Sequence, residues 1–285
     1  MNLADVNSVK RLLESEGFSF KKSLGQNFLI DQSVCPRMAS AACDEDTGVL
    51  EIGAGAGVLT AELAKKAKKV VSVELDERLR PVLQKTLYEF LNTEVVFADA
   101  MKIDLAALIA ERFSDCKRVC VCANLPYYIT SPIIMMLLES RLPIDSVTVM
   151  VQKEAAERLC AKVGSREAGA VTVAVNYYAE SEILFGVPRE SFLPPPNVDS
   201  AVIQLKIRAV PPVEVADEKF FFSLVKACFA QRRKTLINTV SNTLHIEKEL
   251  LRTALLNIGE SETARAEKLS MEALSNLCNE IIRLK

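Results

Sequence analysis

The sequence predicts an α/β protein with a doubly wound, mostly parallel sheet, followed by a smaller helical domain. Short runs of β-branched residues alternate with longer segments whose apolar residues recur every three or four positions. This alternation is typical of parallel strands joined by helical crossovers. Beyond Val210-Pro211-Pro212-Val213 the helical period continues alone, which indicates a second, all-helical part of the chain.

Six segments have the composition of strands, and helical patterns separate the first five. The predicted strands cover residues 49–52, 70–74, 94–97, 118–123, 147–151 and 201–207. Between them, leucines and isoleucines recur at helical spacing, as in Leu79, Leu83 and Leu87. The stretch after residue 151 is less regular, and Pro194-Pro195-Pro196 interrupts it before the last strand.

The proline-containing segment 210–213 indicates a linker between two domains. We expect a first domain over residues 1–209, with an N-terminal helical extension over residues 1–45. The second domain is expected over residues 214–285. Its predicted helices cover residues 220–230, 234–244, 248–256 and 271–284.

Composition excludes several classes of protein. The chain has 285 residues, of which 49% are hydrophobic and 25% charged, as in globular proteins rather than disordered or fibrous ones. No apolar run reaches the roughly 18 residues that a membrane helix needs, and the N-terminus lacks a secretory pattern. We therefore expect a cytoplasmic protein with no membrane association. Eight cysteines without a CxxC pair, and a single histidine, predict reduced thiols and no metal site.

A glycine-rich loop follows the first predicted strand. Gly53, Gly55 and Gly57 alternate with alanines before the next helix, so backbone can approach a ligand closely at this sheet edge. The dinucleotide fingerprint G-x-G-x-x-G would require a small residue where Val58 stands. The observed G-x-G-x-G spacing favours S-adenosylmethionine over NAD. The alternative is a tight strand-to-helix turn without a ligand.

Two acids follow the next two strands. Glu74 closes the second strand, about 20 residues past the loop, where a carboxylate accepts hydrogen bonds from both ribose hydroxyls. Asp99 follows the third strand and is positioned to face an adenine amino group. A solvated acid at a strand end is the alternative for either residue.

The fourth strand is followed by Asn124-Leu125-Pro126-Tyr127 at the same edge of the predicted sheet. The asparagine side-chain oxygen and a backbone carbonyl both accept hydrogen bonds from an exocyclic amine. An aromatic ring nearby can stack on a base. The alternatives are a plain loop for the motif and a core position for the ring.

These motifs, with several others, resemble the KsgA/RsmA family of small-subunit ribosomal RNA adenine N6,N6-dimethyltransferases. The other matching segments are 22–29 (KSLGQNFL), 152–154 (QKE), 192–200 (FLPPPNVDS) and 231–235 (QRRKT). The resemblance implies a class I S-adenosylmethionine-dependent methyltransferase fold. Such a fold has a Rossmann-like, mostly parallel seven-stranded sheet, here with a small C-terminal helical domain. It also implies dimethylation of two adjacent adenines in the hairpin loop near the 3′ end of 16S rRNA, with a role in small-subunit biogenesis.

The resemblance also implies roles for individual residues. The cofactor-binding residues are expected to be Asn27, Leu29, Gly53, Gly55, Glu74, Asp99 and Asn124. The catalytic residues and target pocket are expected to be Asn124, Leu125, Tyr127 and Phe192. RNA contacts are expected from Lys22, Phe28, Arg232, Arg233 and Lys234. The expected cofactor is S-adenosylmethionine, with S-adenosylhomocysteine as the product and no metal.

The expected mechanism is positioning rather than general-base catalysis. The side-chain oxygen of Asn124 and the carbonyl of Leu125 accept the N6 hydrogens and direct the nitrogen lone pair at the methyl group. Tyr127 and Phe192 are expected to stack on the flipped base. The alternative for Phe192 is a buried core position. The expected partner is 16S rRNA in the small subunit or its precursor, bound by a monomer. Since the net charge is only −2, a local patch must hold this RNA.

Three other functions stay open. The related 23S rRNA adenine methyltransferases of macrolide resistance share the pocket, although Leu125 and the cluster Gln231-Arg232-Arg233-Lys234 fit them less well. A non-catalytic ribosome-assembly factor would not need the glycine loop or Glu74. An NAD-dependent oxidoreductase is disfavoured by Val58 and by the lack of a suitable acid or base. Arg232 or Arg233 would, in an alternative role, brace the two domains.

Overall fold

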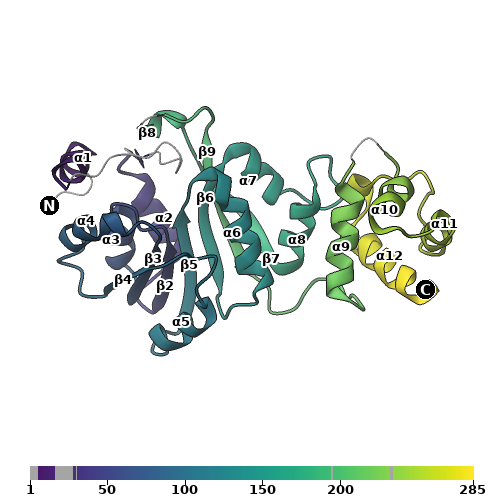
Figure 1. The fold of residues 1–285 in the computed structure, drawn as a ribbon, viewed down its shortest axis with the longest axis horizontal. Helices are drawn as coiled ribbons and strands as arrows, with labels where there is room; N and C mark the ends of the chain where they lie inside the picture. The colour runs from purple at the N-terminus through teal and green to yellow at the C-terminus, as the bar shows by residue number, and fades with distance from the viewer. Residues whose placement is uncertain (1–5, 17–27, 30, 194, 232–233) are drawn as a thin grey trace. The chain divides into compact units, whose positions relative to one another are not determined.

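The computed structural model describes the chain except for residues 1–5, 17–27, 30, 194 and 232–233. Among the described residues, seven strands form one sheet in the order β4-β3-β2-β5-β6-β9-β7 (Figure 1). The strands are β2 (Thr47–Ile52), β3 (Lys69–Glu74), β4 (Thr93–Phe97), β5 (Arg118–Asn124), β6 (Ser146–Gln152), β7 (Ala179–Val187) and β9 (Ser200–Ile207). Parallel pairing joins β4, β3, β2, β5 and β6, and β9 runs antiparallel to β6. This topology confirms the predicted fold class.

The six predicted strands are present, and the structure adds β7. This strand lies at the edge of the sheet, and its sequence AESEILFGV alternates buried, intermediate and exposed side chains. An edge strand does not require a continuous apolar run, because solvent covers part of it. The sequence pattern therefore gave no strand signal in this segment.

Helices flank the sheet at the predicted crossovers. Those of the sheet-containing unit are α1 (Val6–Ser15), α2 (Val34–Ala42), α3 (Val58–Ala64), α4 (Arg80–Thr86), α5 (Leu105–Arg112), α6 (Tyr127–Glu139) and the start of α7 (Lys153–Leu159). Helix α8 (Ala170–Tyr178) belongs to the second unit. Apolar side chains of the central strands, such as Val49, Leu50 and Val121, are fully buried. Their burial under the helices fixes the sheet and hence the positions of the strand ends.

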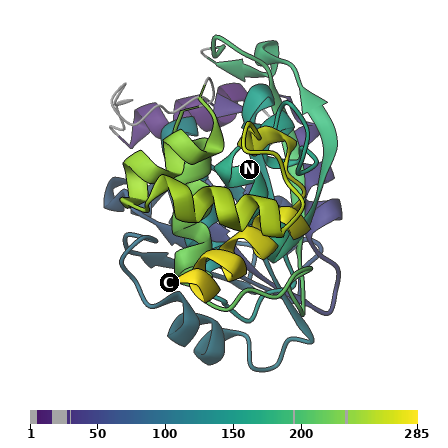
Figure 2. The ribbon, with the colours of Figure 1, turned by 90° about the vertical axis from the view of Figure 1, so that its right-hand side faces the viewer.

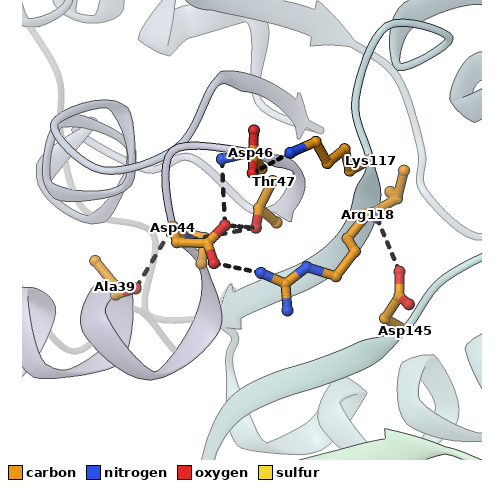
Figure 3. A network of polar contacts seen from close by, with 9 residues as sticks. Ala39, Asp44, Asp46, Thr47, Lys117, Arg118 and Asp145 are labelled. Atoms are coloured by element: carbon orange, nitrogen blue, oxygen red, sulfur yellow. Dashed lines mark hydrogen bonds and ion pairs between the residues drawn. The ribbon is translucent and has the colours of Figure 1, made fainter.

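Ion pairs fasten the amino-terminal edge of the sheet (Figure 3). The Asp44 carboxylate accepts hydrogen bonds from the Thr47 hydroxyl, at 2.7 Å, and from the Arg118 guanidinium. The Lys117 ammonium lies 2.7 Å from the Asp46 carboxylate. Because Thr47 begins β2 and Arg118 begins β5, these contacts join the starts of two neighbouring strands. Each of these exposed pairs contributes little to the free energy of unfolding. They lie at the amino-terminal edge, away from the polar groups that follow the strands at the carboxyl edge.

A separate two-stranded sheet joins segments far apart in the chain. Strand β1 (Phe28–Leu29) pairs antiparallel with β8 (Phe192–Leu193), and Leu29 lies opposite Phe192. The backbone amide of Asp31 donates to the Ser191 carbonyl at 3.3 Å, and the Ser191 hydroxyl donates to the Asp31 carboxylate at 3.2 Å. Two motifs that the sequence analysis singled out, at residues 22–29 and 192–200, are therefore joined by backbone pairing.

The chain divides into two compact units. The first comprises residues 1–156 and 182–207, and the second comprises residues 157–181 and 208–285. The predicted range 1–209 therefore includes a segment, 157–181, that groups with the helical unit. The reason is aromatic packing within that unit: Tyr178 of α8 stacks on Phe222 of α9 with ring centroids 5.3 Å apart.

Four helices follow β9 in the second unit (Figure 2). They are α9 (Glu218–Phe229), α10 (Leu236–Leu244), α11 (Lys248–Asn257) and α12 (Met271–Leu284). Phe221, Leu224, Leu251 and Leu274 are fully buried and form its core. Of the three consecutive phenylalanines near the start of α9, Phe221 is fully buried, and Phe220 and Phe222 are partly buried.

The basic cluster comprises Arg232, Arg233 and Lys234. The prediction of a helix over residues 234–244 is wrong for Lys234. Helix α10 begins at Leu236, after Thr235 in an extended conformation, and the Thr235 carbonyl accepts from the Thr239 amide at 3.1 Å. Lys234 lies in the connection between α9 and α10, where its amide donates to the Gln231 carbonyl at 3.0 Å. Thr235 is the N-cap residue of α10, and its extended backbone keeps the helix from reaching back to Lys234.

Two further findings concern helix length and the cysteines. No helix in the described part of the chain combines the length and apolar character needed to cross a membrane. Each of the eight cysteines, all within the described residues, has a free thiol. Burial raises the pKa of Cys35 and of Cys228 to about 12, which keeps both in the neutral thiol form.

Candidate active site

The strand register places the singled-out residues along one edge of the sheet. Ile52 at the end of β2 lies opposite Val73 of β3 and Ala123 of β5. The residues that follow, Gly53, Glu74 and Asn124, therefore stand at the carboxyl edge. Asp99 comes two residues after β4 ends, at the same edge. Parallel pairing makes this convergence unavoidable, because each crossover returns the chain to the opposite edge.

The glycine loop requires glycine at three positions. Gly53, Gly55 and Gly57 have φ values of 81°, 56° and 83°, a region that residues with a side chain rarely adopt. A Cβ atom at Gly57 would lie only 2.8 Å from the Thr86 hydroxyl oxygen. At Gly55, by contrast, a Cβ atom would meet no protein atom within 4 Å. Gly57 therefore serves close packing, and Gly55 leaves space on the outer side of the loop.

Glu74 is tied to this loop. Its Oε2 atom accepts a hydrogen bond from the Gly55 amide at 2.9 Å, and its Oε1 atom accepts from the Asp76 amide at 2.8 Å. Burial raises the pKa of the Glu74 carboxyl, and the hydrogen bonds oppose this rise. Each oxygen has a further lone pair, so the carboxylate can still accept hydroxyl donors such as those of a ribose.

Sequence reasoning missed a second acid, Glu51 of β2. Its side chain is completely buried, and its Oε2 atom accepts from the Thr60 hydroxyl at 2.6 Å and from the Ser72 hydroxyl at 2.5 Å. Its Oε1 atom has no hydrogen-bond partner. Burial raises the pKa of Glu51 to about 7. The signal in the sequence was a charged residue inside an apolar strand, two positions before the glycine loop.

Asp99 is a more accessible acceptor. Its Oδ1 atom accepts from the Met101 amide at 3.0 Å, and its Oδ2 atom lies 3.1 Å from the Lys102 ammonium. These groups, the Met101 amide first, hold the pKa of Asp99 below its ordinary value. The carboxylate is therefore ionised near neutral pH and suited to accept a hydrogen bond from an amino group.

The Asn124 motif bridges β5 and α6. Asn124 is the last residue of β5, Pro126 precedes the helix, and Tyr127 is its first helical residue. The Leu125 side chain is buried, and its Cδ2 atom lies 3.3 Å from where a Cβ atom of Gly53 would stand. The motif therefore contacts the glycine loop. Asn124 and Leu125 therefore lie next to the glycine loop.

Tyr127 has a partner that the sequence analysis did not name. Its phenol oxygen lies 2.6 Å from the Ser200 hydroxyl, at the start of β9. Since Ser200 pairs with Gln152 at the end of β6, this contact also lies at the carboxyl edge. Half-burial raises the pKa of the Tyr127 phenol, which keeps it protonated. The hydroxyl contact fixes the direction of the ring.

The structure buries Phe192, one of the residues expected in the target pocket. Its side chain is only 3% exposed and packs in an apolar cluster with Met38, Met150 and Val202, among others. The core position that the sequence analysis held as the alternative is the one observed. Leu29, opposite Phe192 in the small sheet, is partly buried against the same cluster.

Several predicted residues lie outside the described part of the chain. These are Lys22, Asn27, Arg232 and Arg233. The backbone of Phe28 is described as part of β1. Lys234 is described and its side chain is exposed. In the described residues no group of three or more histidine, cysteine, aspartate or glutamate side chains is arranged to hold a metal ion.

Known proteins are similar to this chain in sequence and in fold. A sequence model of the family described as "Ribosomal RNA adenine dimethylase" matches residues 17–283. The chain belongs to this family. Within it, the chain is 49% identical to the ribosomal RNA small subunit methyltransferase A of Geobacillus thermodenitrificans, over 99% of this chain and 98% of the relative. It is 48% identical, with the same coverage, to the protein of that name from Bacillus mycoides.

Solved structures of ribosomal RNA methyltransferases share the fold. A dimethyladenosine transferase from Plasmodium falciparum has a TM-score of 0.69 and 26% identity, covering 88% of this chain and 96% of its own. The 23S rRNA methyltransferase ErmE has a TM-score of 0.67 and 30% identity, covering 90% of this chain and 100% of its own. The chain thus has the class I methyltransferase fold of an adenine dimethylase.

Proposed function

We propose that this protein uses S-adenosylmethionine to dimethylate N6 of two adjacent adenines in the hairpin loop near the 3′ end of 16S rRNA. The observation that carries the proposal is the contact between Leu125 and Gly53. This contact puts a motif that can accept hydrogen bonds from an amine next to a glycine loop that a ligand can approach closely. Membership in the adenine dimethylase family supports the same base and the same nitrogen.

The residues at the sheet edge fit S-adenosylmethionine. When bound, this cofactor supplies a methyl group on a positively charged sulfur. Gly53 and Gly55 allow backbone to approach its methionine part, Glu74 accepts from the ribose hydroxyls, and Asp99 accepts from the adenine amino group. Asn27 and Leu29 are proposed to contact it from the N-terminal segment.

Asn124 and Leu125 position the target amine. The lone pair of an adenine N6 is conjugated with the ring, so the amine is a poor nucleophile. The Asn124 side-chain oxygen and the Leu125 carbonyl accept its two hydrogens, which favours a tetrahedral nitrogen whose lone pair faces the methyl group. After the first transfer one N6 hydrogen is left, and one of these two hydrogen bonds persists for the second. After each transfer the methylated nitrogen would release one proton to water, so the attack itself would not require a general base.

The target adenine leaves its stack and lies against the Tyr127 ring. The Ser200 contact supports this arrangement, because it engages the phenol hydroxyl and leaves the ring face for stacking on a base. Phe28 is proposed to contribute to the same pocket. Lys22, Arg232, Arg233 and Lys234 are proposed to contact RNA phosphates, which set affinity rather than sequence preference.

The small subunit is the proposed substrate particle, bound by a monomer in the cytoplasm. The 49% identity to a small subunit methyltransferase, against 30% to the 23S rRNA methyltransferase ErmE, supports this choice. The test supplies labelled S-adenosylmethionine with unmethylated small subunits, large subunits or naked rRNA, and maps the modified base. Dimethyladenine at two adjacent positions of 16S rRNA is expected. Label confined to 23S rRNA would overturn the proposal in favour of the large-subunit activity.

A further inference from the structure

The two tyrosines that begin α6 have opposite environments. Tyr127 is half-buried and bonded to Ser200, whereas Tyr128 is 63% exposed. Among the described side chains, the other largely exposed aromatic ring is Tyr88, at 82%. Tyr128 follows the Asn124 motif directly, so a bare aromatic face stands next to the groups proposed to hold the target adenine.

Other exposed apolar side chains also lie at this edge. Leu75 directly follows Glu74, and Met101 comes two residues after Asp99, so both lie near the acids proposed to hold the cofactor's adenosine. Tyr128 follows Asn124 in α6, and Val198 precedes β9, which lies on the opposite side of β5 from β3 and β4 in the sheet. Antiparallel β9 starts at the edge where β6 ends, because Ser200 pairs with Gln152. The exposed apolar groups therefore extend from the cofactor side to the target side.

The helix geometry separates the two rings. Consecutive residues of an α-helix project about 100° apart, so Tyr127 and Tyr128 cannot lie on the same base. A flipped adenine leaves one face of its neighbour without a stacking partner, and aromatic side chains replace such contacts in single-stranded RNA. The substrate proposed above supplies that neighbour, because its two target adenines are adjacent.

We propose that Tyr128 stacks on the base next to the flipped adenine and is a specificity-determining residue for the RNA. This inference rests on the proposed function, since it requires an RNA loop with an extruded base. Tyr128 stabilises the extruded state by replacing the stacking lost between the two bases. It acts on RNA binding, and the cofactor site and the methyl transfer itself do not depend on it.

Two variants and a matched control test the proposal. Tyr128→Ala should raise KM for small subunits at least about fivefold, the lower end of measured base-stacking effects, with little change in kcat. Tyr128→Phe should behave like the wild type, because stacking needs the ring and not the hydroxyl. The control is Tyr88→Ala. Tyr88 lies between α4 and the start of β4, near Asn92, whose carbonyl accepts from the Val70 amide at the amino-terminal edge.

A binding measurement separates this proposal from the proposed function. A target-loop RNA hairpin carrying 2-aminopurine beside the target adenine should fluoresce more brightly with Tyr128→Ala than with the wild type or Tyr128→Phe. An unchanged KM and unchanged fluorescence in Tyr128→Ala would overturn the stacking role, as would an equal loss in Tyr88→Ala or Tyr128→Phe. If the wild type methylates only large subunits, the proposed small-subunit function is wrong. The same comparison of Tyr128 variants, made on the 23S rRNA target, then still tests the stacking role of Tyr128. A wild type that binds no RNA overturns both.

Discussion

The Oε2 atom of Glu74 accepts a hydrogen bond from the backbone amide of Gly55 at 2.9 Å. This contact joins the end of β3 to the middle of the glycine loop after β2. The acid proposed to hold the ribose therefore also holds the loop proposed to face the methionine part of the cofactor. Changing either residue is expected to affect both halves of the ligand site.

The first prediction concerns the cofactor. S-adenosylmethionine and S-adenosylhomocysteine should raise the melting temperature, and NAD should not. A ligand present at 100 times its Kd adds about 2.7 kcal/mol to the free energy of unfolding, which thermal melting detects. Glu74→Ala should shrink the shift and lower the ligand-free melting temperature, because the partly buried Gly55 and Asp76 amides lose their acceptor. Glu77→Ala, at a nearby exposed acid, is the control. Equal stabilisation by NAD would contradict the assignment.

The second prediction concerns buried Glu51. Its pKa of about 7 lies above the ordinary value of 4.5, so the folded state binds the proton more tightly than the unfolded chain. Stability from this group is present at low pH and declines as pH rises from about 4.5 to about 7, by at most about 3 kcal/mol.

Glu51→Gln should remove this decline, because the amide does not titrate. Urea unfolding of both proteins at pH 5 and pH 8 measures it, and the difference between the two proteins cancels the other titrating groups. The Gln variant should gain relative to the wild type at pH 8. An identical pH dependence in the two proteins would show that Glu51 does not titrate in this range.

The third prediction concerns Asn124. Asn124→Ala should lower kcat by about a hundredfold or more, because it removes a preorganised acceptor from the target amine. The melting temperature and the shift produced by S-adenosylhomocysteine should change little. Single-turnover methylation of small subunits provides the rate. Near-wild-type turnover in this variant would remove Asn124 from the mechanism.

The fourth prediction separates the ring of Tyr127 from its hydroxyl. Tyr127→Ala should be severely impaired, whereas Tyr127→Phe and Ser200→Ala should each lose less than about tenfold in kcat, since they remove one hydrogen bond and keep the ring. Combining the last two changes should add little to either alone, because both break the same contact. If Tyr127→Phe abolished activity and Tyr127→Ala were no worse, the phenol hydroxyl would be the working group.

The fifth prediction concerns the basic cluster and the N-terminal Lys22. Single alanine variants of Lys22, Arg232, Arg233 and Lys234 should weaken binding to small subunits. Each phosphate contact removed should reduce the slope of log affinity against log salt by roughly one. Lys219→Ala, at an exposed lysine of α9, is the control. Wild-type slopes combined with lower melting temperatures would assign the cluster a structural role.

Local patterns were enough to predict most of the sheet and the convergence at its edge. β-branched runs and helical periods are visible within a few residues, and parallel crossovers return every strand end to one edge. For this reason Gly53, Glu74, Asn124 and Asp99 could be placed together without a structure. The edge strand β7 could not be predicted, because exposed polar residues interrupt its apolar residues.

The sequence by itself determined the order of strands and helices, the glycine loop and the polar groups at the strand ends. Only the tertiary structure decided which distant residues meet. It paired Leu29 with Phe192, buried the Phe192 ring, and placed Ser200 against Tyr127. The physical reason is that periodicity encodes which face of an element is apolar. The partner of that face depends on how whole elements pack, which no local pattern specifies.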